Sequence, residues 1–217
     1  MPRKFTGDTL VLATHNKGKI AELRDMLGPR VPHILTADEL GLPEPLELGT
    51  TFLENAMTKA LTAARLCKFP VLAEDSGLCI AALNGAPGVY SADWAGHPRN
   101  FRAAMHRVLA QVADVEGSSG TARGSGAASD PGLKGPDRSA YFQTVMILAW
   151  PDGHTEITEG RVEGVITDVM RGTDGHGYDP IFMPNGHAKT FAEMGRAEKG
   201  TLSHRKQAVI KMLDRCC

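Results

Sequence analysis

The stretch Val71–Leu78 constrains this chain more than any other part of its sequence. It reads Val-Leu-Ala-Glu-Asp-Ser-Gly-Leu, a short apolar run that leads into two adjacent carboxylates, a hydroxyl and a glycine. A short apolar run with a β-branched start is typical of a buried strand. We therefore expect Glu74 and Asp75 at the end of such a strand, where a cleft can form beside the core. Consecutive side chains of an extended segment point to opposite faces, so only one acid can face a given site.

Two interpretations fit this stretch when it is taken alone. A carboxylate beside the core suits a hard cation or a general base, Ser76 adds a small donor, and Gly77 lets the backbone approach a ligand. A solvated acidic turn would contain the same residue types. The rest of the chain has to decide between the two interpretations.

Composition narrows the class of protein. The chain has 217 residues, 42% of them hydrophobic, and a formal net charge of −1. The length predicts one domain over residues 1–217, or two lobes around a common core. The near-neutral charge gives no support for nucleic acid or an anionic membrane as partner. No apolar run could cross a bilayer or serve as a secretory signal. Four cysteines without Cys-x-x-Cys spacing fit a reducing compartment, so we expect a cytoplasmic location.

A strand, a polar loop and a helix are predicted near the N-terminus. Residues 9–14 form the strand, residues 15–19 are polar, and Ile20, Leu23 and Leu27 recur at helical spacing. Such a loop can direct backbone N–H groups, a lysine and the positive end of a helix dipole at an anion. The Walker pattern is absent, and a solvated strand–helix turn fits the same spacing.

A second helix is predicted to begin after Thr51. Thr51 and Glu54 have the Ser/Thr-x-x-Glu spacing of a capping box. Apolar residues at positions 52, 56, 60, 63 and 67 form one stripe, which predicts a buried face. Lys59 lies off that stripe, so a solvated lysine is the alternative to a functional one. A short strand near Ile34 and an acid-rich connection that carries Glu47 precede this helix.

The second half of the chain adds a helix and further strands. Apolar spacing predicts a helix over residues 101–113 and a long strand over residues 140–150, with return strands within residues 155–169. Between them, residues 117–138 are rich in Gly, Ser and Ala, which predicts a mobile surface insertion within the domain. We expect that trimming this insertion would leave the fold and turnover nearly intact.

The C-terminal part contains a glycine-rich loop and a capped helix. Residues 172–180 hold three glycines among polar and aromatic residues, so their backbone can approach a ligand closely. Ser203 is the predicted N-cap of the last helix, which places His204 and Arg205 in its first turn. The helix dipole disfavours cations there, which indicates that they serve an anionic group.

Six motifs in this order resemble the inosine triphosphate pyrophosphatase family, and the resemblance covers nearly the whole chain. The motifs lie in residues 10–19, 51–60, 75–78, 85–92, 177–182 and 203–205. The resemblance implies an α/β fold with an elongated mixed central sheet, flanked by helices, and two lobes around a nucleotide cleft. It also implies a homodimer that uses Mg²⁺ to cleave ITP, dITP and XTP to the monophosphate and pyrophosphate, which would cleanse the nucleotide pool.

The family's residue roles carry over position by position. Glu47 and Asp75 are the implied magnesium ligands, and Asp75 is also the implied proton acceptor. The implied substrate contacts are Thr14, His15, Asn16, Lys17, Gly18 and Lys19 in the first phosphate loop, Lys59, Ser76, and, around the base and sugar, His176, Gly177, Tyr178, Asp179, Lys199, His204 and Arg205. Two lysines with Mg²⁺ can offset most of the roughly four negative charges of a triphosphate.

The implied base pocket is rich in hydrogen-bond donors from Lys199, His204 and Arg205. Such donors can hydrogen-bond to the O6 acceptor of inosine and xanthosine. They would face the amine of adenine donor to donor, which leaves donors unpaired. This predicts that Arg205→Ala would narrow the preference for ITP over ATP. An equal loss for both nucleotides would instead assign the arginine to the phosphates or to the fold.

Two positions depart from the family pattern. His176 stands where phenylalanine is usual, so an imidazole would have to stack on the base. Glu74 stands where aspartate is frequent, and we expect little effect because the metal role belongs to Asp75.

Two other functions are compatible with parts of this sequence. One is a related pyrophosphohydrolase with another nucleotide preference, such as the Maf-like enzymes, against which residues 203–205 argue. The other is a non-catalytic nucleotide-binding protein, against which the acids and Lys19 argue.

Overall fold

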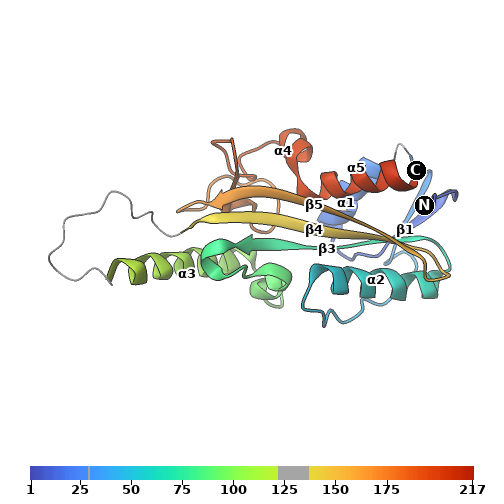
Figure 1. The fold of residues 1–217 in the computed structure, drawn as a ribbon, viewed down its shortest axis with the longest axis horizontal. Helices are drawn as coiled ribbons and strands as arrows, with labels where there is room; N and C mark the ends of the chain where they lie inside the picture. Colours follow the sequence, from blue (N-terminus) through green and yellow to red (C-terminus); the bar gives the residue numbers. More distant parts are fainter. Residues whose placement is uncertain (29, 122–136) are drawn as a thin grey trace. The chain divides into compact units, whose positions relative to one another are not determined.

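The computed structural model describes residues 1–28, 30–121 and 137–217. Six strands and five α-helices lie in this part of the chain (Figure 1). In chain order they are β1 Thr9–Leu12, α1 Lys17–Leu27, β2 His33–Thr36, α2 Phe52–Cys67, β3 Val71–Ile80, α3 Phe101–Thr121, β4 Ser139–Ala149, β5 Thr155–Ile166, β6 Phe182–Pro184, α4 Arg196–Leu202 and α5 His204–Cys216. None of the helices in the described ranges is long and apolar enough to cross a membrane.

The strands form one mixed sheet. Their order in the sheet is β2-β1-β3-β4-β5-β6. β1 runs parallel to β2 and to β3, with Val11 opposite Val71, whereas β5 and β6 are antiparallel. This arrangement confirms the predicted α/β class with a mixed central sheet.

The chain divides into two compact units. Unit 1 comprises Met1–Ser76, Gln143–Arg161 and Thr201–Cys217, and unit 2 comprises Gly77–Phe142 and Val162–Gly200. Strands β3, β4 and β5 each contain residues of both units. The single domain and the cleft that the sequence indicates stay predictions, and each unit is described by itself below.

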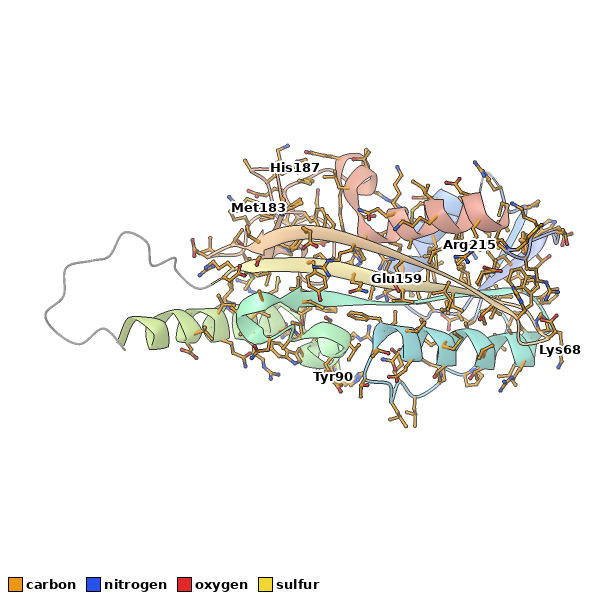
Figure 2. The ribbon with its side chains drawn as sticks, in the orientation of Figure 1. Lys68, Tyr90, Glu159, Met183, His187 and Arg215 are labelled. Atoms are coloured by element: carbon orange, nitrogen blue, oxygen red, sulfur yellow. The ribbon has the colours of Figure 1, made fainter. Side chains whose placement is uncertain are left out.

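Helix α2 of unit 1 begins and ends as its sequence predicts. The Thr51 side chain accepts a hydrogen bond from the N–H of Glu54, and the Glu54 carboxylate accepts one from the N–H of Thr51, which completes the capping box. Lys68 ends the helix in the left-handed conformation with φ 63° (Figure 2). Four residues of the predicted apolar stripe are buried, namely Phe52, Ala56, Ala60 and Ala63. Lys59 is buried as well, so the solvated alternative for this lysine is wrong.

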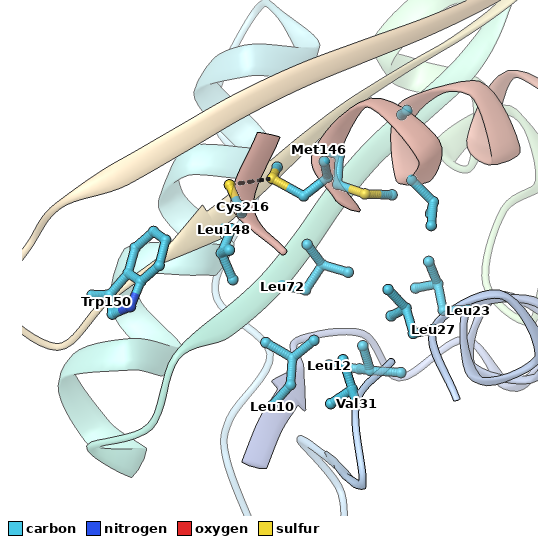
Figure 3. Packing of buried hydrophobic residues seen from close by; sticks show 13 residues of the cluster. Leu10, Leu12, Leu23, Leu27, Val31, Leu72, Met146, Leu148, Trp150 and Cys216 are labelled. Carbon is cyan, nitrogen blue, oxygen red and sulfur yellow. Dashed lines mark hydrogen bonds between the residues drawn. The ribbon is translucent and has the colours of Figure 1, made fainter. Parts of the chain in front are cut away.

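A cluster of buried side chains fills unit 1 (Figure 3). It joins β1, β3 and β4 to α1 and α5, which pack against each other. The cluster contains Leu10, Leu12, Leu23, Leu27, Val31, Leu72, Met146, Leu148, Trp150, Ala208, Val209, Met212 and Cys216. Helices α1 and α5 lie on the side of the unit 1 strands opposite to α2 (Figure 1). Each face of β3 therefore meets a different helix.

Unit 2 has a small aromatic core. The ring centroids of Phe142 and Phe182 lie 4.7 Å apart, and those of Phe182 and Phe191 lie 5.2 Å apart. Phe101 at the start of α3 meets the ring of Tyr178 edge-on at 5.7 Å. These contacts anchor the strand β6 and the segment that precedes it.

The central strand β3 is longer than predicted. It continues to Ile80, so Glu74 and Asp75 lie inside the strand and not at its end. Leu78, Cys79 and Ile80 are buried. Burial of these three apolar side chains is favourable, and it accounts for the continuation of the strand beyond Glu74 and Asp75.

Other boundaries differ from the prediction for reasons of length and cooperativity. Helix α3 extends to Thr121, into the predicted insertion, because adding a residue to an existing helix is easier than starting one. The remainder of that insertion lies largely outside the described residues. The return strands are one continuous strand, β5. β6 and α4 have three and seven residues, too few to show a periodic pattern.

Candidate active site

Strand β3 places its two acids on opposite faces. Asp75 contacts Lys59 of α2, whereas Glu74 contacts Lys19 of α1 and Arg205 of α5. This alternation was predicted from the period of two residues in an extended chain. One strand thus supplies a carboxylate to each of two buried polar clusters in unit 1.

The first cluster is an ammonium between two carboxylates. The Lys59 Nζ atom lies 3.1 Å from Asp75 Oδ1 and 3.1 Å from Glu47 Oε2. Lys59 and Asp75 are 7% and 6% exposed, while the Glu47 side chain is 34% exposed. The cluster therefore extends from the buried strand toward solvent at Glu47. Glu47, Lys59 and Asp75 were all predicted site residues, and the structure brings them together.

Asn55 ties the Glu47 segment to Asp75. Its Nδ2 donates to Asp75 Oδ2 at 3.4 Å, and its Oδ1 accepts from the N–H of Gly49 at 2.8 Å. A Cβ atom on Gly49 would lie 2.6 Å from that same Oδ1, so a side chain there would push the two segments apart. Asn55 is not among the site residues predicted from the sequence. The available signal was its position four residues before Lys59, which puts both side chains on one face of α2.

The second cluster surrounds Glu74, which is 2% exposed. Its Oε1 lies 2.9 Å from Lys19 Nζ and 3.1 Å from Arg205 Nε. Its Oε2 accepts a hydrogen bond of 2.7 Å from the Thr144 hydroxyl of β4. The sequence-based expectation that Glu74 matters little overlooked these contacts, because each partner comes from a segment distant in sequence.

Arg205 is held by three groups of unit 1. Besides Glu74, its Nη1 donates to Glu22 Oε2 at 2.5 Å and its Nη2 donates to Ser76 Oγ at 3.4 Å. Ser203 caps α5 by accepting from the N–H of Lys206, as predicted. The anionic partners expected for a first-turn cation are therefore carboxylates of the protein itself.

Close packing of the backbone fixes the start of α5. A Cβ atom on Gly160 of β5 would lie 1.8 Å from the carbonyl oxygen of His204, so only glycine allows this approach. His204 is buried at 7% exposure. The predicted site residues His204 and Arg205 are thus placed against the strands of unit 1.

Burial and neighbouring charge shift the pKa values of these groups. Burial alone raises the pKa of Glu74, but Arg205 and Lys19 outweigh it and hold that pKa well below its usual range. Burial lowers the pKa of Lys19, and Glu74 opposes this fall without reversing it. Burial likewise lowers the pKa of Lys59, but Asp75 and Glu47 outweigh it and raise that pKa. The acids of β3 thus favour the charged form of both lysines.

The pKa of Asp75 is raised. Burial is the main cause, Lys59 opposes it, and the like charge of Glu47 adds to the rise. A carboxylate with a raised pKa accepts a proton more readily, which suits a general base.

The predicted first phosphate loop begins α1. Asn16 is the N-cap, and its Oδ1 accepts from the backbone N–H groups of Gly18 and Lys19 at 3.0 and 3.2 Å. The N–H of Asn16 donates to the Thr14 hydroxyl, and His15 Nδ1 lies 2.5 Å from Asp38 Oδ1. Lys17 and Gly18 are exposed. In this structure the Asn16 side chain occupies the place that an anion could take at the helix start.

The remaining predicted substrate residues belong to unit 2. Asp179 Oδ2 accepts from the N–H of His176 at 2.8 Å and lies 2.6 Å from Lys199 Nζ. The Tyr178 hydroxyl donates to the carbonyl of Ser91 at 2.8 Å, and Tyr178 is buried. Gly177 has a positive φ of 68°, which favours glycine at this turn. The structure brings these four predicted residues of the loop and Lys199 together within unit 2.

The donor set of the first cluster fits a hard cation. Within the described ranges no group of three or more His, Cys, Asp or Glu side chains could hold a metal ion. Glu47 and Asp75 nevertheless converge on one ammonium, so a positive charge already lies between them. Mg²⁺ prefers oxygen ligands and keeps several waters, so two carboxylates can be sufficient.

Comparison with known proteins gives consistent matches over the whole chain. The Ham1 family model matches residues 10–215. A dITP/XTP pyrophosphatase of Rhodospirillum centenum is 47% identical, with 99% of this chain and 98% of the relative covered. One of Gluconobacter oxydans is 42% identical, with 100% and 95% covered. A HAM1 protein structure from Coxiella burnetii has a TM-score of 0.79 and 36% identity, with 94% of this chain and 95% of the other covered.

Proposed function

The chain belongs to the Ham1 family, and we propose that it hydrolyses nucleoside triphosphates of non-standard purines, such as dITP, XTP and ITP. The products are the nucleoside monophosphate and pyrophosphate. One observation carries the proposal: each acid on β3 contacts a lysine of the predicted phosphate-binding set, Glu74 the partly buried Lys19 and Asp75 the buried Lys59. The relatives named dITP/XTP pyrophosphatase support the substrate class.

The two lysines supply the positive charge that a polyphosphate needs. An ammonium has three N–H donors. The structure assigns one donor of Lys19 to Glu74 and two of Lys59 to Glu47 and Asp75. A remaining donor on each lysine can bind a phosphate oxygen, and such charge-assisted hydrogen bonds strengthen as charge develops in the transition state.

Asp75 is the proposed proton acceptor. A water oxygen attacks the α-phosphorus, the bond from that phosphorus to the α–β bridging oxygen breaks, and pyrophosphate leaves with the electron pair. The proton of the attacking water passes to the Asp75 carboxylate. Asn55 and Lys59 hold one oxygen each of that carboxylate, which keeps it oriented.

Glu47 and Asp75 are the residues that would hold Mg²⁺. When bound, the ion would offset phosphate charge and orient the polyphosphate. Asn55 and Gly49 would keep the Glu47 segment beside Asp75. The magnesium requirement is part of our proposal and rests on the oxygen ligands described above.

A substrate panel tests the proposed function. Purified protein with Mg²⁺ is offered dITP, XTP, ITP, dGTP and ATP, and the products are separated to distinguish pyrophosphate from orthophosphate. We expect pyrophosphate and the monophosphate, with dITP, XTP and ITP cleaved fastest. Release of orthophosphate and a diphosphate would overturn the proposed cleavage. Equal rates for all five nucleotides would overturn the proposed selectivity.

Two properties of the whole protein complete the proposal. We propose a homodimer, on the family resemblance, so light scattering should give twice the chain mass of 23.2 kDa. We also propose a cytoplasmic location, which the cysteine pattern supports. A monomeric mass at micromolar concentration would contradict the first property.

A further inference from the structure

We propose that Glu74 is a positioning residue that fixes the Lys19 ammonium for polyphosphate binding and couples it to Arg205. The inference rests on the proposed function, because Lys19 is a proposed phosphate contact. It goes beyond that function because Glu74 would then determine how tightly the substrate binds. In the proposed mechanism Glu74 contacts neither the substrate nor the metal.

The contacts of Glu74 join four elements through one carboxylate. Its Oε1 lies 2.9 Å from the Nζ atom of Lys19 on α1 and 3.1 Å from the Nε atom of Arg205 on α5. Its Oε2 accepts a hydrogen bond of 2.7 Å from the Thr144 hydroxyl of β4, and the oxygen of that hydroxyl lies 3.2 Å from the carbonyl oxygen of Asp75. Thr144 is fully buried. Thr144 therefore fixes the carboxylate plane, and the carboxylate fixes the two cations.

Lys19 is held but can still be reached. Its side chain is 18% exposed, whereas the Glu74 side chain is 1% exposed. One oxygen of Glu74 restricts the long, flexible side chain of Lys19, and the other N–H donors of the Lys19 ammonium remain suited to an anion. Preorganisation of this kind lowers the entropy lost on binding, so it affects affinity for the ligand directly.

Because Arg205 lies close to Lys19, the Glu74 carboxylate is needed to neutralise the two cations as well as to orient them. Both cations contact the same oxygen, so their positive charges lie close together in a buried region. The like charge of Arg205 lowers the pKa of Lys19, whereas Glu74 raises it. Without the carboxylate the two cations would repel each other, and Lys19 would move away from its present position.

The test compares Glu74→Gln with the parent in steady-state hydrolysis of dITP and in calorimetric binding of inorganic tripolyphosphate. Glutamine keeps the size but removes the charge. We expect KM and the tripolyphosphate Kd to rise about 10- to 100-fold, the loss expected for one charge-assisted hydrogen bond. We expect kcat per correctly folded molecule to fall less than KM rises.

Glu22→Gln is the matched control. Glu22 is the second carboxylate on Arg205, at 2.5 Å from Nη1, and it also lies on α1. Its replacement perturbs the same arginine and leaves Glu74 in place. We expect both KM and the tripolyphosphate Kd to stay within about threefold of the parent, a change of less than one hydrogen bond.

Glu74→Asp provides rescue and covers a failure of Glu74→Gln to fold. Aspartate keeps the charge on a side chain one methylene shorter, so KM and Kd should lie between those of the parent and Glu74→Gln. If the glutamine variant does not fold, a rise of at least about threefold in both quantities for Glu74→Asp supports the proposal. If Glu74→Asp folds and its KM and tripolyphosphate Kd equal those of the parent, the proposal is overturned.

The outcomes separate this inference from the proposed function. If the parent cleaves none of the nucleotides, the proposed function fails, and tripolyphosphate binding still tests Glu74. If Glu74→Gln lowers thermal stability and kcat but leaves KM and Kd unchanged, Glu74 is only structural and the inference is overturned. An equal loss of affinity in Glu22→Gln also overturns it, because the effect would then belong to Arg205.

Discussion

Asp75 has the contacts expected of a catalytic carboxylate. It is buried beside Lys59 and Asn55, and its pKa is raised by burial and by Glu47. Asp75→Asn keeps the shape but removes the proton acceptor and one proposed metal ligand. We expect pyrophosphate release at saturating Mg²⁺ to fall about 10²–10⁴-fold or more, with little change in the circular dichroism spectrum. Turnover within threefold of the parent would show that Asp75 is structural.

Lys59 supplies the positive charge between the two proposed metal ligands. Because it neutralises Glu47 and Asp75, it should oppose a metal ion in the absence of nucleotide. We therefore expect Lys59→Met to bind Mg²⁺ more tightly than the parent in calorimetry without nucleotide. Lys68→Met at the end of α2 is the control, since it removes a lysine of the same helix region. Equal affinities for parent and Lys59→Met would contradict this competition.

Arg205 is better suited to holding protein carboxylates than to reading a base in this structure. It is 3% exposed, and its nitrogens contact Glu74, Glu22 and Ser76. Removing one partner of a buried ion pair costs about 3–5 kcal/mol of stability. We expect Arg205→Ala to lower the melting temperature and to reduce kcat/KM for ITP and ATP by similar factors. A selective loss for ITP would restore the base-reading role that the sequence indicates.

The start of helix α2 positions both Asn55 and Lys59. The Thr51 hydroxyl accepts from the Glu54 N–H at 3.2 Å. Thr51→Ala removes this cap and should lower the free energy of unfolding by about 1 kcal/mol. Chemical denaturation would measure the loss. Thr58→Ala, on the exposed face of the same helix, should leave stability within about 0.5 kcal/mol. Equal effects of the two changes would mean that the cap contributes nothing.

The buried contacts of Glu74 should make the stability of the whole protein depend on pH. The pKa of Glu74 is depressed in the folded protein, and the ordinary value is 4.5. Its contribution is therefore fully present above pH 4.5 and is lost as pH falls through the folded pKa. In urea unfolding from pH 7 to pH 3, the stability advantage of the parent over Glu74→Gln should shrink below pH 4.5. A constant advantage over that range would contradict the ionised state of Glu74.

The features that depend on local spacing could be predicted from the amino-acid sequence alone. The capping box of α2, the N-cap Ser203 and the opposite facing of Glu74 and Asp75 follow from offsets of one to four residues. The motif order indicated the family, and the matches over residues 10–215 support it. These features were predictable because hydrogen-bond geometry fixes the period of helices and strands.

The pairing of the buried charges could not be predicted without the folded structure. Glu74 contacts Lys19, Thr144 and Arg205, and the last two lie 70 and 131 residues away in sequence. No local period relates such positions, so the buried network remained hidden in the sequence. The same holds for Lys59, whose place off the apolar stripe suggested solvent although it lies between Glu47 and Asp75. Burial of a charge depends on partners that only the folded chain brings within hydrogen-bond distance.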